Sequence, residues 1–426
     1  MNKKKICIIG LGYVGLPLSY LCLEKGLRVY GLDVDKEKIS AIKRGESPIE
    51  DRSFIKYFKK SKYKLEATTD SKVIKKADIV IICVPTPVDE NNYPDLGPLK
   101  SAIKTVSKHI REGQLIIIES TVNPGVTNEV VKTVLEKSGL KAGKDFYLSH
   151  CPERIDPGNK KWTIKNIPRV FGSFSQKGAD ETKEFYQSIL EAEITQVSNI
   201  ETAEAIKVVE NTFRDVNIAL VNELAKSFNI MGINIVEVIK GASTKPYAFM
   251  PHYPGCGVGG HCIPVDPYYL IERGKKEGFE HNFLSLARSI NNSMPSYTIE
   301  KVVEGLNEVK KSVKGINISV LGLAYKNNID DIRGSPAVEI IDGLKKMGAN
   351  IIIYDPYIPE KSNVGTLESA LNKAKCIVIT AAHSEFKQLS ANKLKKEGIL
   401  VVVDGRNCLN KKEIMDAGII YKGIGQ

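Results

Sequence analysis

The stretch that indicates the fold is Ile6-Cys7-Ile8-Ile9-Gly10-Leu11-Gly12-Tyr13-Val14-Gly15. Its first four residues form a β-branched apolar run typical of a buried strand, and Leu16 to Lys25 has the pattern of a helix. Between them, the glycines of G-x-G-x-x-G permit a tight turn, a close backbone approach to a pyrophosphate and helix–strand packing. The helix N-terminus then offers amide donors to the phosphates. The stretch predicts a dinucleotide site, the alternative being a glycine turn without a ligand.

The second predicted strand, Val29 to Leu32, ends at Asp33, 18 residues after Gly15. A carboxylate at this point accepts hydrogen bonds from the ribose hydroxyls and repels a 2′-phosphate. The cofactor is therefore predicted to be NAD. Lys36 and Lys38 follow closely and are able to compensate the charge, which leaves NADP as the alternative.

Continuous apolar runs at Ile79 to Val84 and Leu115 to Glu119 flank a helical pattern from Leu99 to Ile110. Strands that are apolar on both faces and alternate with helices predict a parallel sheet covered on both sides. We expect this first α/β domain, a Rossmann-like NAD-binding domain, to comprise residues 1–196.

From Glu201 to Met231 apolar residues recur mostly every three or four positions, without Pro or internal Gly before the end. This predicts one long amphipathic helix that joins two domains and offers a dimerisation face. A second helix is expected at Phe283 to Asn291, before Pro295. Residues 197–300 are the predicted central helical domain.

The last segment repeats the pattern of the first. Ile318 to Tyr325 resembles Ile6 to Tyr13, and further strands are expected at Ile351 to Asp355 and Cys376 to Thr380. The chain is thus predicted to be an α/β protein with two Rossmann-like, doubly wound domains, the second at residues 301–426, joined by a long central helix and a helical middle domain. The second turn, Gly322 to Lys326, lacks the middle glycine and gains a lysine, which favours a nucleotide diphosphate over a second dinucleotide.

The composition excludes several classes of protein. Of 426 residues, 42% are hydrophobic and 26% charged, as in globular proteins, and no apolar run approaches the roughly 18 residues of a membrane span. The apolar run after the first lysines is too short for a secretion signal, so a cytoplasmic location is expected. The net charge of +11 favours anionic partners, but no basic run with interleaved aromatics supports nucleic-acid binding.

The eight cysteines form no C-x-x-C pair, so free thiols are expected. The segment from Tyr253 to Asp266 contains four glycines and two prolines, which exclude a regular element and bring the backbone close to a ligand. We call residues 253–266 the cysteine loop. Cys262 is its candidate nucleophile, and a buried structural cysteine is the alternative. A metal site is not predicted, because the spacing of His252, Cys256, His261 and Cys262 matches no common zinc pattern.

Lys207, Asn211 and Arg214 share one face of the long helix at positions i, i+4 and i+7. A lysine and an amide on a rigid helix can donate hydrogen bonds to a developing oxyanion. The alternative is a solvated polar stripe.

Seven motifs occur in an order that resembles the UDP-glucose/GDP-mannose dehydrogenase family. They are GLGYVG from Gly10, PTP from Pro85, STV from Ser120, CPER from Cys151, K-x3-N-x2-R from Lys207, GVGGHCIPVDP around Cys262 and YK-x6-R from Tyr325. The resemblance covers essentially the whole chain. It implies an NAD-dependent four-electron oxidation of the C6 alcohol of a nucleotide sugar to a carboxylate, without release of the aldehyde.

The resemblance also assigns roles. Cys262 forms a thiohemiacetal and then a thioester, and Lys207 and Asn211 stabilise the oxyanion. Asp266 and Glu153 order or activate water, and Thr121 acts on the cofactor side. The residues implied for NAD are Gly10, Gly12, Tyr13, Val14, Gly15, Asp33, Lys38, Thr86, Thr121 and Arg333. Those implied for the UDP-sugar are Arg154, Ile155, Lys207, Asn211, Arg214, Gly259, Tyr325, Lys326 and Arg406. A homodimer through the long helix is implied, with the partner chain completing the substrate site.

The motifs are most similar to those of the UDP-N-acetylglucosamine 6-dehydrogenases. The N-acetylmannosamine enzymes usually carry VLPG where this chain has Ile155 to Gly158, and His-Pro-Arg where it has Lys245 to Tyr247. UDP-glucose enzymes commonly carry GFGGSC at Gly257 to Cys262. We therefore expect UDP-N-acetyl-D-glucosamine first, then UDP-N-acetyl-D-mannosamine or UDP-glucose.

Two other functions compete with this one. A two-electron β-hydroxyacid dehydrogenase shares the first domain and a long helix but does not need Cys262. A nucleotide-sugar-binding regulator would be expected to lose the cysteine or Lys207, and both are present.

Overall fold

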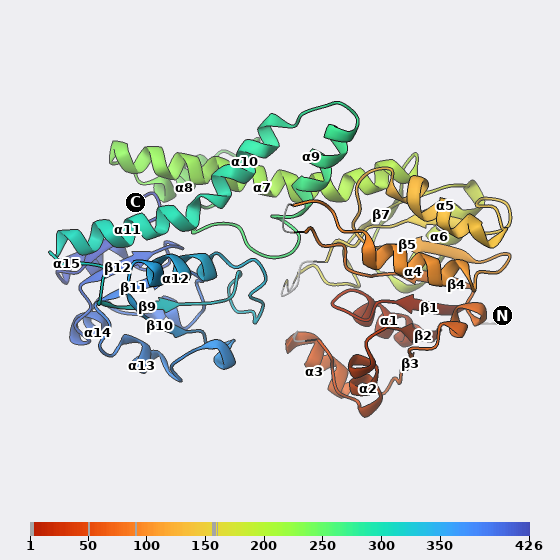
Figure 1. Cartoon of the computed structure of the whole chain (residues 1–426), viewed down its shortest axis with the longest axis horizontal. Coiled ribbons are helices and arrows are strands. Elements are labelled where there is room, and N and C mark those ends of the chain that lie inside the picture. Colours follow the sequence, from red (N-terminus) through yellow and green to blue (C-terminus); the bar gives the residue numbers. More distant parts are fainter. Residues whose placement is uncertain (1–3, 50–51, 90–91, 156–158, 160) are drawn as a thin grey trace. The chain divides into compact units, whose positions relative to one another are not determined.

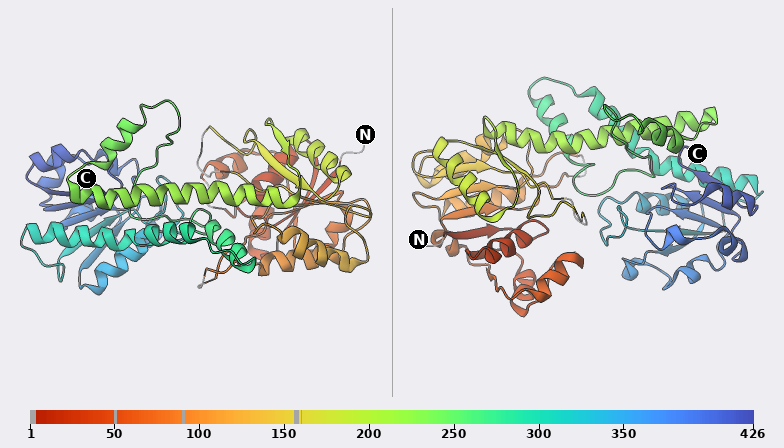
Figure 2. Two further views of the ribbon diagram at one scale, coloured as in Figure 1. Left: turned by 90° about the horizontal axis from the view of Figure 1, so that it is seen from above. Right: turned by 180° about the vertical axis from the view of Figure 1, so that it is seen from behind.

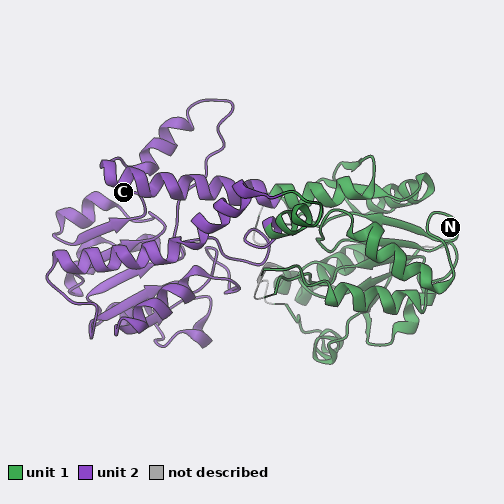
Figure 3. Ribbon diagram, turned by 45° about the horizontal axis from the view of Figure 1, so that its top comes forward, with its two compact units in different colours: residues 1–210, 268–279 green, residues 211–267, 280–426 purple. Residues whose placement is uncertain are grey.

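The computed structural model describes residues 4–49, 52–89, 92–155, 159 and 161–426 (Figure 1). The chain forms two compact units, Met1–Glu210 with Tyr268–Phe279 (unit 1) and Asn211–Pro267 with Glu280–Gln426 (unit 2) (Figure 3). Helix α7 (Ile200–Met231) begins in unit 1 and ends in unit 2. The predicted long helix is confirmed, and Figure 2 shows it as one continuous element.

Unit 1 is built on an eight-stranded sheet with the order β3-β2-β1-β4-β5-β6-β7-β8. Its strands are β1 (Lys5–Ile9), β2 (Arg28–Leu32), β3 (Glu66–Thr68), β4 (Ile79–Ile82), β5 (Leu115–Ile118), β6 (Tyr147–His150), β7 (Arg169–Ser173) and β8 (Ile194–Gln196). Neighbouring strands are parallel except β6 and β7, which are antiparallel. The first six strands follow the doubly wound order in which dinucleotides bind where the strand order reverses, between β1 and β4.

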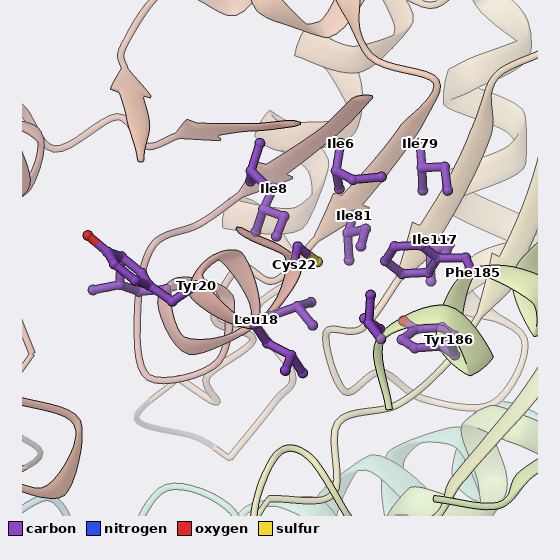
Figure 4. Packing of buried hydrophobic residues seen from close by; sticks show 14 of the residues in the cluster. Ile6, Ile8, Leu18, Tyr20, Cys22, Ile79, Ile81, Ile117, Phe185 and Tyr186 are labelled. Carbon is purple, nitrogen blue, oxygen red and sulfur yellow. The ribbon is translucent and has the colours of Figure 1, made fainter. Parts of the chain in front are cut away.

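Helices cover both faces of this sheet. They are α1 (Gly15–Glu24), α2 (Lys36–Arg44), α3 (Arg52–Lys60), α4 (Gly97–Ser107), α5 (Thr133–Leu135) and α6 (Gln176–Ile189), with short turns η1 (Ser71–Lys76), η2 (Thr127–Lys132) and η3 (Glu136–Ser138). Alternate residues of β1 enter different cores: Ile6 and Ile8 pack with α1 and α6 (Figure 4), whereas Cys7 and Ile9 pack with α4. Each fully buried isoleucine stabilises the fold by roughly 1.5–3 kcal/mol.

Unit 2 contains a five-stranded, wholly parallel sheet with the order β10-β9-β11-β12-β13. Its strands are β9 (Asn317–Leu321), β10 (Asn350–Tyr354), β11 (Cys376–Ile379), β12 (Val401–Asp404) and β13 (Ile420–Gly423). The helices are α8 (Ile235–Ala242), α10 (Asn282–Asn292), α11 (Met294–Glu308), α12 (Pro336–Lys346), α13 (Leu367–Leu371), α14 (Ala391–Lys396) and α15 (Lys411–Asp416), with η4 (Pro359–Lys361) and η5 (Phe386–Gln388). Helix α9 (Asp266–Lys276) begins in unit 2 and continues in unit 1.

The predicted repeat of an α/β domain is confirmed in detail. Gly10 and Gly322 both have positive φ values, 92° and 102°. The N–H of Gly10 donates to the carbonyl of Leu32 (2.9 Å), and the N–H of Gly322 donates to that of Tyr354 (2.9 Å). The same turn therefore closes the first strand onto the second in both sheets.

Several boundaries differ from the prediction. Val84, Glu119 and Asp355 lie beyond the ends of their strands. The cysteine loop is irregular up to Val265, but Asp266 is already the first residue of α9. Within the described part of the chain, no helix combines the length and apolar character that a membrane crossing requires.

The fold makes a testable prediction about acid sensitivity. His150, at the end of β6, is fully buried, and burial lowers its pKa to about 3. Because the unfolded pKa is about 6.5, its contribution to stability is complete above pH 6.5 and is lost on acidification. Between pH 7 and 4.5 this amounts to about 2.5 kcal/mol.

On acidification from pH 7 to 4.5, we expect the free energy of unfolding to fall less in His150→Asn than in the wild type. The difference between the two decreases is the contribution of His150. Urea denaturation of both proteins at the two pH values measures it. An identical pH dependence in variant and wild type would contradict the prediction.

Candidate active site

The three glycines of the first turn have different surroundings. A Cβ on Gly10 would lie 2.7 Å from the Cys83 carbonyl oxygen, and one on Gly15 would lie 2.0 Å from the Gly10 carbonyl oxygen. These two glycines are thus required by the fold. A Cβ on Gly12 meets nothing within 4 Å. The open backbone at Gly12 therefore fits the close approach of a pyrophosphate.

Asp33 connects this turn to the end of β2. Its carboxylate accepts the N–H of Leu11 (2.8 Å) and of Asp35 (3.0 Å), and Lys38 Nζ lies 3.7 Å from it. Because a carboxylate has about four lone-pair positions, it retains capacity for ribose hydroxyls. Lys38 therefore lies beside Asp33, and its role at the cofactor stays a prediction.

Tyr13 and Val14 connect the glycine turn to α1. Val14 is the N-cap residue and makes no side-chain cap, so the amides of the first helical turn are left to backbone partners or a ligand. Tyr13 packs partly buried against the core below β1. Both residues therefore lie at the N-terminus of α1, the end of a helix that is suited to binding an anion.

The PTP and STV segments are joined through Thr86 and Thr121. The Thr86 hydroxyl donates to the Thr121 carbonyl (2.6 Å), and the Tyr269 hydroxyl donates to the Thr86 carbonyl. The ends of β4 and β5 are thereby held together, next to the glycine turn in the sheet order.

Glu153 and Lys207 belong to unit 1. Burial raises the pKa of Glu153 to about 7, against the opposing effect of the Lys207 and Arg169 charges. A carboxyl with a pKa near neutrality is suited to general acid–base work. Lys207 itself is only 8% exposed, so it does not belong to a solvated stripe.

Arg154 and Ile155 follow Glu153 in the chain. The Arg154 guanidinium makes two bonds to Glu210 (2.6 and 3.2 Å) and donates to the carbonyl of Pro168 (3.0 Å). The N–H of Ile155 donates to the Glu153 carboxylate. The rest of the stretch used to compare sugar specificity, residues 156–158, lies outside the described residues.

In unit 2 the glycines of the cysteine loop run against the second Rossmann-like domain. A Cβ on Gly255 would lie 2.7 Å from Arg406 Nη1, and one on Gly259 would lie 2.6 Å from Tyr325 Cβ. The N–H of Gly260 donates to the Arg333 carbonyl (2.9 Å). The loop therefore brings the predicted substrate residues Gly259, Tyr325 and Arg406 together.

Cys262 is partly exposed, and its carbonyl accepts the N–H of Asp266 (2.9 Å) at the start of α9. The carboxylate of Asp266 accepts a hydrogen bond from the Asn211 amide (2.6 Å). Cys256, by contrast, is fully buried, with Sγ 3.5 Å from the Gly405 carbonyl oxygen. Within the described ranges no three histidine, cysteine or acidic side chains gather as a metal site.

Of the remaining predicted residues of unit 2, Lys326, Arg333 and Arg406 lie around the second glycine turn, and Arg214 lies on α7. The Arg333 guanidinium pairs with Asp331 (2.5 Å), whose pKa is lowered by this arginine although burial opposes the shift. Arg406 donates from Nε to the carbonyl of Thr380 (2.7 Å). Lys326 is half-buried, and Arg214 on α7 is exposed.

Sequence reasoning missed Glu204, a buried carboxylate that organises the segment after Thr121. It accepts the N–H of Gly125 (2.5 Å) and Thr127 (2.8 Å), and burial raises its pKa to about 7. The available signal was an acidic residue three positions before Lys207, on the same side of an amphipathic helix.

Comparison with known proteins agrees with this geometry. Three family models match the chain: the NAD binding domain of the UDP-glucose/GDP-mannose dehydrogenase family at residues 4–190, its central domain at 201–293 and its UDP binding domain at 319–411. The chain belongs to this family and is an NAD-dependent nucleotide-sugar dehydrogenase, an oxidoreductase.

Individual relatives carry two substrate names. The chain is 36% identical to a UDP-N-acetyl-D-mannosamine dehydrogenase of Pyrococcus horikoshii over 425 residues, 99% of each protein. It is also 36% identical to a UDP-N-acetyl-D-glucosamine 6-dehydrogenase of Pseudomonas aeruginosa over 409 residues, 93% of this chain and 95% of that protein. The solved structure of the UDP-D-ManNAc dehydrogenase from P. horikoshii superposes with a TM-score of 0.92 at 37% identity, covering 99% of both chains.

The open surroundings of Gly12 generate a prediction for the cofactor. Gly12→Ala leaves the Tm of the free protein unchanged, because the new methyl group meets no protein atom, but weakens NAD binding about tenfold or more. Calorimetric titration with NAD measures this effect. Gly365→Ala, equally open but distant in the sequence, is the matched control that leaves NAD affinity unchanged. Unaltered affinity in Gly12→Ala would contradict the proposed position of the pyrophosphate.

Proposed function

We propose that this protein oxidises the C6 alcohol of a UDP-sugar to the uronate in a four-electron reaction, with UDP-N-acetyl-D-glucosamine as the first candidate substrate. The observation that carries the proposal is the position of Cys262. This partly exposed thiol lies in a glycine loop packed on Tyr325 and Arg406, four residues before the first residue of α9. The positive end of a helix dipole favours the thiolate.

NAD, held by residues that include Gly12 and Asp33, would supply the hydride acceptor for each of the two oxidations at C6, with a fresh NAD for the second. After the first, the Cys262 thiolate adds to the aldehyde carbon and forms a C–S bond, giving a thiohemiacetal. Loss of a second hydride and a proton from this adduct leaves a thioester on Cys262. Water then breaks the C–S bond, which releases the carboxylate and returns the thiol. The sum is one alcohol, two NAD and one water converted to one carboxylate, two NADH and three protons.

The other side chains are suited to supporting steps. Lys207 and the Asn211 amide are donors for the oxyanion of the tetrahedral intermediates. Glu153, with a pKa of about 7, is the proposed base that activates water, and Asp266, tied to Asn211, the residue that orders it. The remaining predicted contacts to NAD and to the UDP-sugar are part of the same proposal.

Two observations bear on the sugar. The motif similarity around Cys151 and Cys262 favours the N-acetylglucosamine enzymes, whereas relatives of equal identity carry the N-acetylglucosamine and the N-acetylmannosamine name. UDP-N-acetyl-D-mannosamine is therefore the second candidate, followed by UDP-glucose.

The decisive experiment supplies NAD with each of the three UDP-sugars and measures NADH formed per sugar consumed. We expect two NADH per sugar, with UDP-N-acetylglucosamine giving the highest kcat/KM. One NADH per sugar would overturn the four-electron mechanism, and no NADH with any sugar would favour a nucleotide-sugar-binding regulator.

Cys262→Ala is expected to abolish uronate formation, by a factor of about 10³ or more, because no covalent adduct can form. Product analysis by mass spectrometry measures this loss. Cys408→Ala is the matched control, since burial raises the pKa of the Cys408 thiol and removes it as a nucleophile. Undiminished uronate from Cys262→Ala would exclude the thioester route.

The proposed homodimer uses an apolar face of unit 2. Figure 2 shows α8 and the loop after it projecting from the rest of this unit. The apolar side chains between 49% and 87% exposed there and on α7 include Phe213, Leu220, Ile230, Tyr247, Met250 and Tyr253. The ring centroids of Phe213 on α7 and His252 in the loop after α8 are 6.2 Å apart, so this loop packs on α7. A second copy of the chain is the proposed occupant, since exposed apolar patches of this kind mark interfaces.

Leu220→Glu is expected to convert the dimer to a monomer, because it buries an unpaired carboxylate in the proposed interface. Light scattering measures the mass. Val338→Glu places the same charge on α12, where the valine is 42% exposed, and is expected to leave the mass unchanged. An unchanged mass for Leu220→Glu would refute this interface.

A cytoplasmic location also remains part of the proposal. All eight cysteines are described and none forms a disulfide, as is usual in a reducing compartment.

A further inference from the structure

A buried cluster of charged and polar side chains in unit 1 has no part in the function proposed above. It consists of Arg169, the first residue of β7, Glu119, directly after β5, and Tyr186 on α6. All three are at most 1% exposed. We call these residues the Arg169 cluster.

The contacts within the Arg169 cluster are incomplete. The Tyr186 hydroxyl donates to Glu119 Oε1 (2.5 Å), and Arg169 Nη1 lies 3.7 Å from Glu119 Oε2. None of the three guanidinium nitrogens of Arg169 has a hydrogen-bond partner among the described residues. Burying a guanidinium in this way costs more than an apolar side chain of similar volume, so stability does not explain the cluster.

The main chain places Glu153 next to the cluster. The N–H of Glu153 donates to the carbonyl of Glu119 (3.3 Å), and the N–H of Cys151 donates to that of Ile118 (2.9 Å). Arg154 donates to the carbonyl of Pro168, the residue before Arg169 (3.0 Å). The CPER segment is therefore held between the end of β5 and the start of β7.

We propose that Arg169 and Glu119 are positioning residues for Glu153, a buried pair of opposite charges whose balance keeps that carboxyl ready to exchange a proton during catalysis. Neither residue needs to touch the substrate for this effect, because charges act over several ångströms in a water-poor interior. The inference rests on the proposed role of Glu153 as the base that activates water.

The charges that face Glu153 come from three elements. Lys207 on α7 and Arg169 on β7 favour its ionised form, and Glu119 after β5 opposes it. The neighbouring thiols, Cys83 and Cys151, have pKa values raised by burial and are neutral. Arg169 itself stays charged: burial opposes this, but the nearby acidic groups, Glu119 foremost, outweigh it and raise its pKa. Arg169 and Glu119 therefore act on Glu153 in opposite directions.

The test uses this difference in sign. The titration of the Glu153 carboxyl is followed by difference infrared spectroscopy on the full-length protein without substrate, and Glu153→Gln identifies its band. Arg169→Met is expected to raise the midpoint by about one pH unit, and Glu119→Gln to lower it. In the double variant the two shifts largely cancel. Arg169→Lys, which keeps the charge, is expected to restore most of the wild-type midpoint.

The double variant also guards against misfolding, because replacing both charges of a buried pair is tolerated better than removing one. Shifts of opposite sign support the proposal, and midpoints that coincide in all variants, or move in the same direction, overturn it. The acid limb of the pH profile of kcat is expected to follow the same order.

The two proposals fail separately in this design. If no UDP-sugar is oxidised but the midpoints move in opposite directions, the proposed function is wrong, and the effect of Arg169 and Glu119 on Glu153 is supported. If NADH forms and the midpoints coincide, the function stands and the charge pair has no such role.

Discussion

The structure depends on one hydrogen bond that occurs twice. A carboxylate directly after the second strand of each domain accepts the N–H of the residue that follows the first glycine of the turn. Asp33 holds Leu11 in this way (2.8 Å), and Asp355 holds Leu323 (2.7 Å). Each bond ties the turn to the neighbouring strand and aims the following backbone at the sheet edge where ligands bind. Because the first residue of each turn is a glycine with positive φ, other residues are strained at that position.

The two domains use this carboxylate differently. Asp355 is fully buried and also contacts Nε2 of His383 (3.1 Å), whereas Asp33 is 7% exposed and pairs with the half-buried Lys38 (3.7 Å). The N–H of Asn328 donates to Nδ1 of His383 (2.8 Å), which leaves Nε2 as the ring nitrogen that donates to Asp355. His383 therefore ties down the loop that carries Tyr325 and Lys326, and the ribose-binding role expected of Asp33 is closed to Asp355.

Most of the elements were predictable, because hydrophobic periodicity and the Gly and Pro residues that end helices and strands are local features of the sequence. The apolar runs at β1, β4 and β5, the 32-residue helix α7 and the repeat at β9 to β11 all follow from patterns within short windows. The contacts around the site were not predictable in the same way. Glu204 reaches Gly125 over 79 residues, Asn211 reaches Asp266 over 55, and Tyr186 reaches Glu119 over 67. No spacing rule covers such distances.

The sequence alone determined which functional groups are available to the site. They are a glycine turn suited to phosphates, an acidic residue after β2, a cysteine in a loop with four glycines, and a lysine and an amide on one helix. Residue type and local spacing carry this information, because turns, helix faces and strand ends are short-range structures. The tertiary structure decided which of these groups are buried and what faces them. Only packing brings the Glu153 segment next to Glu119 and Arg169 and leaves Cys262 partly exposed while it encloses Cys256, since burial and neighbouring charge arise from segments far apart in the chain.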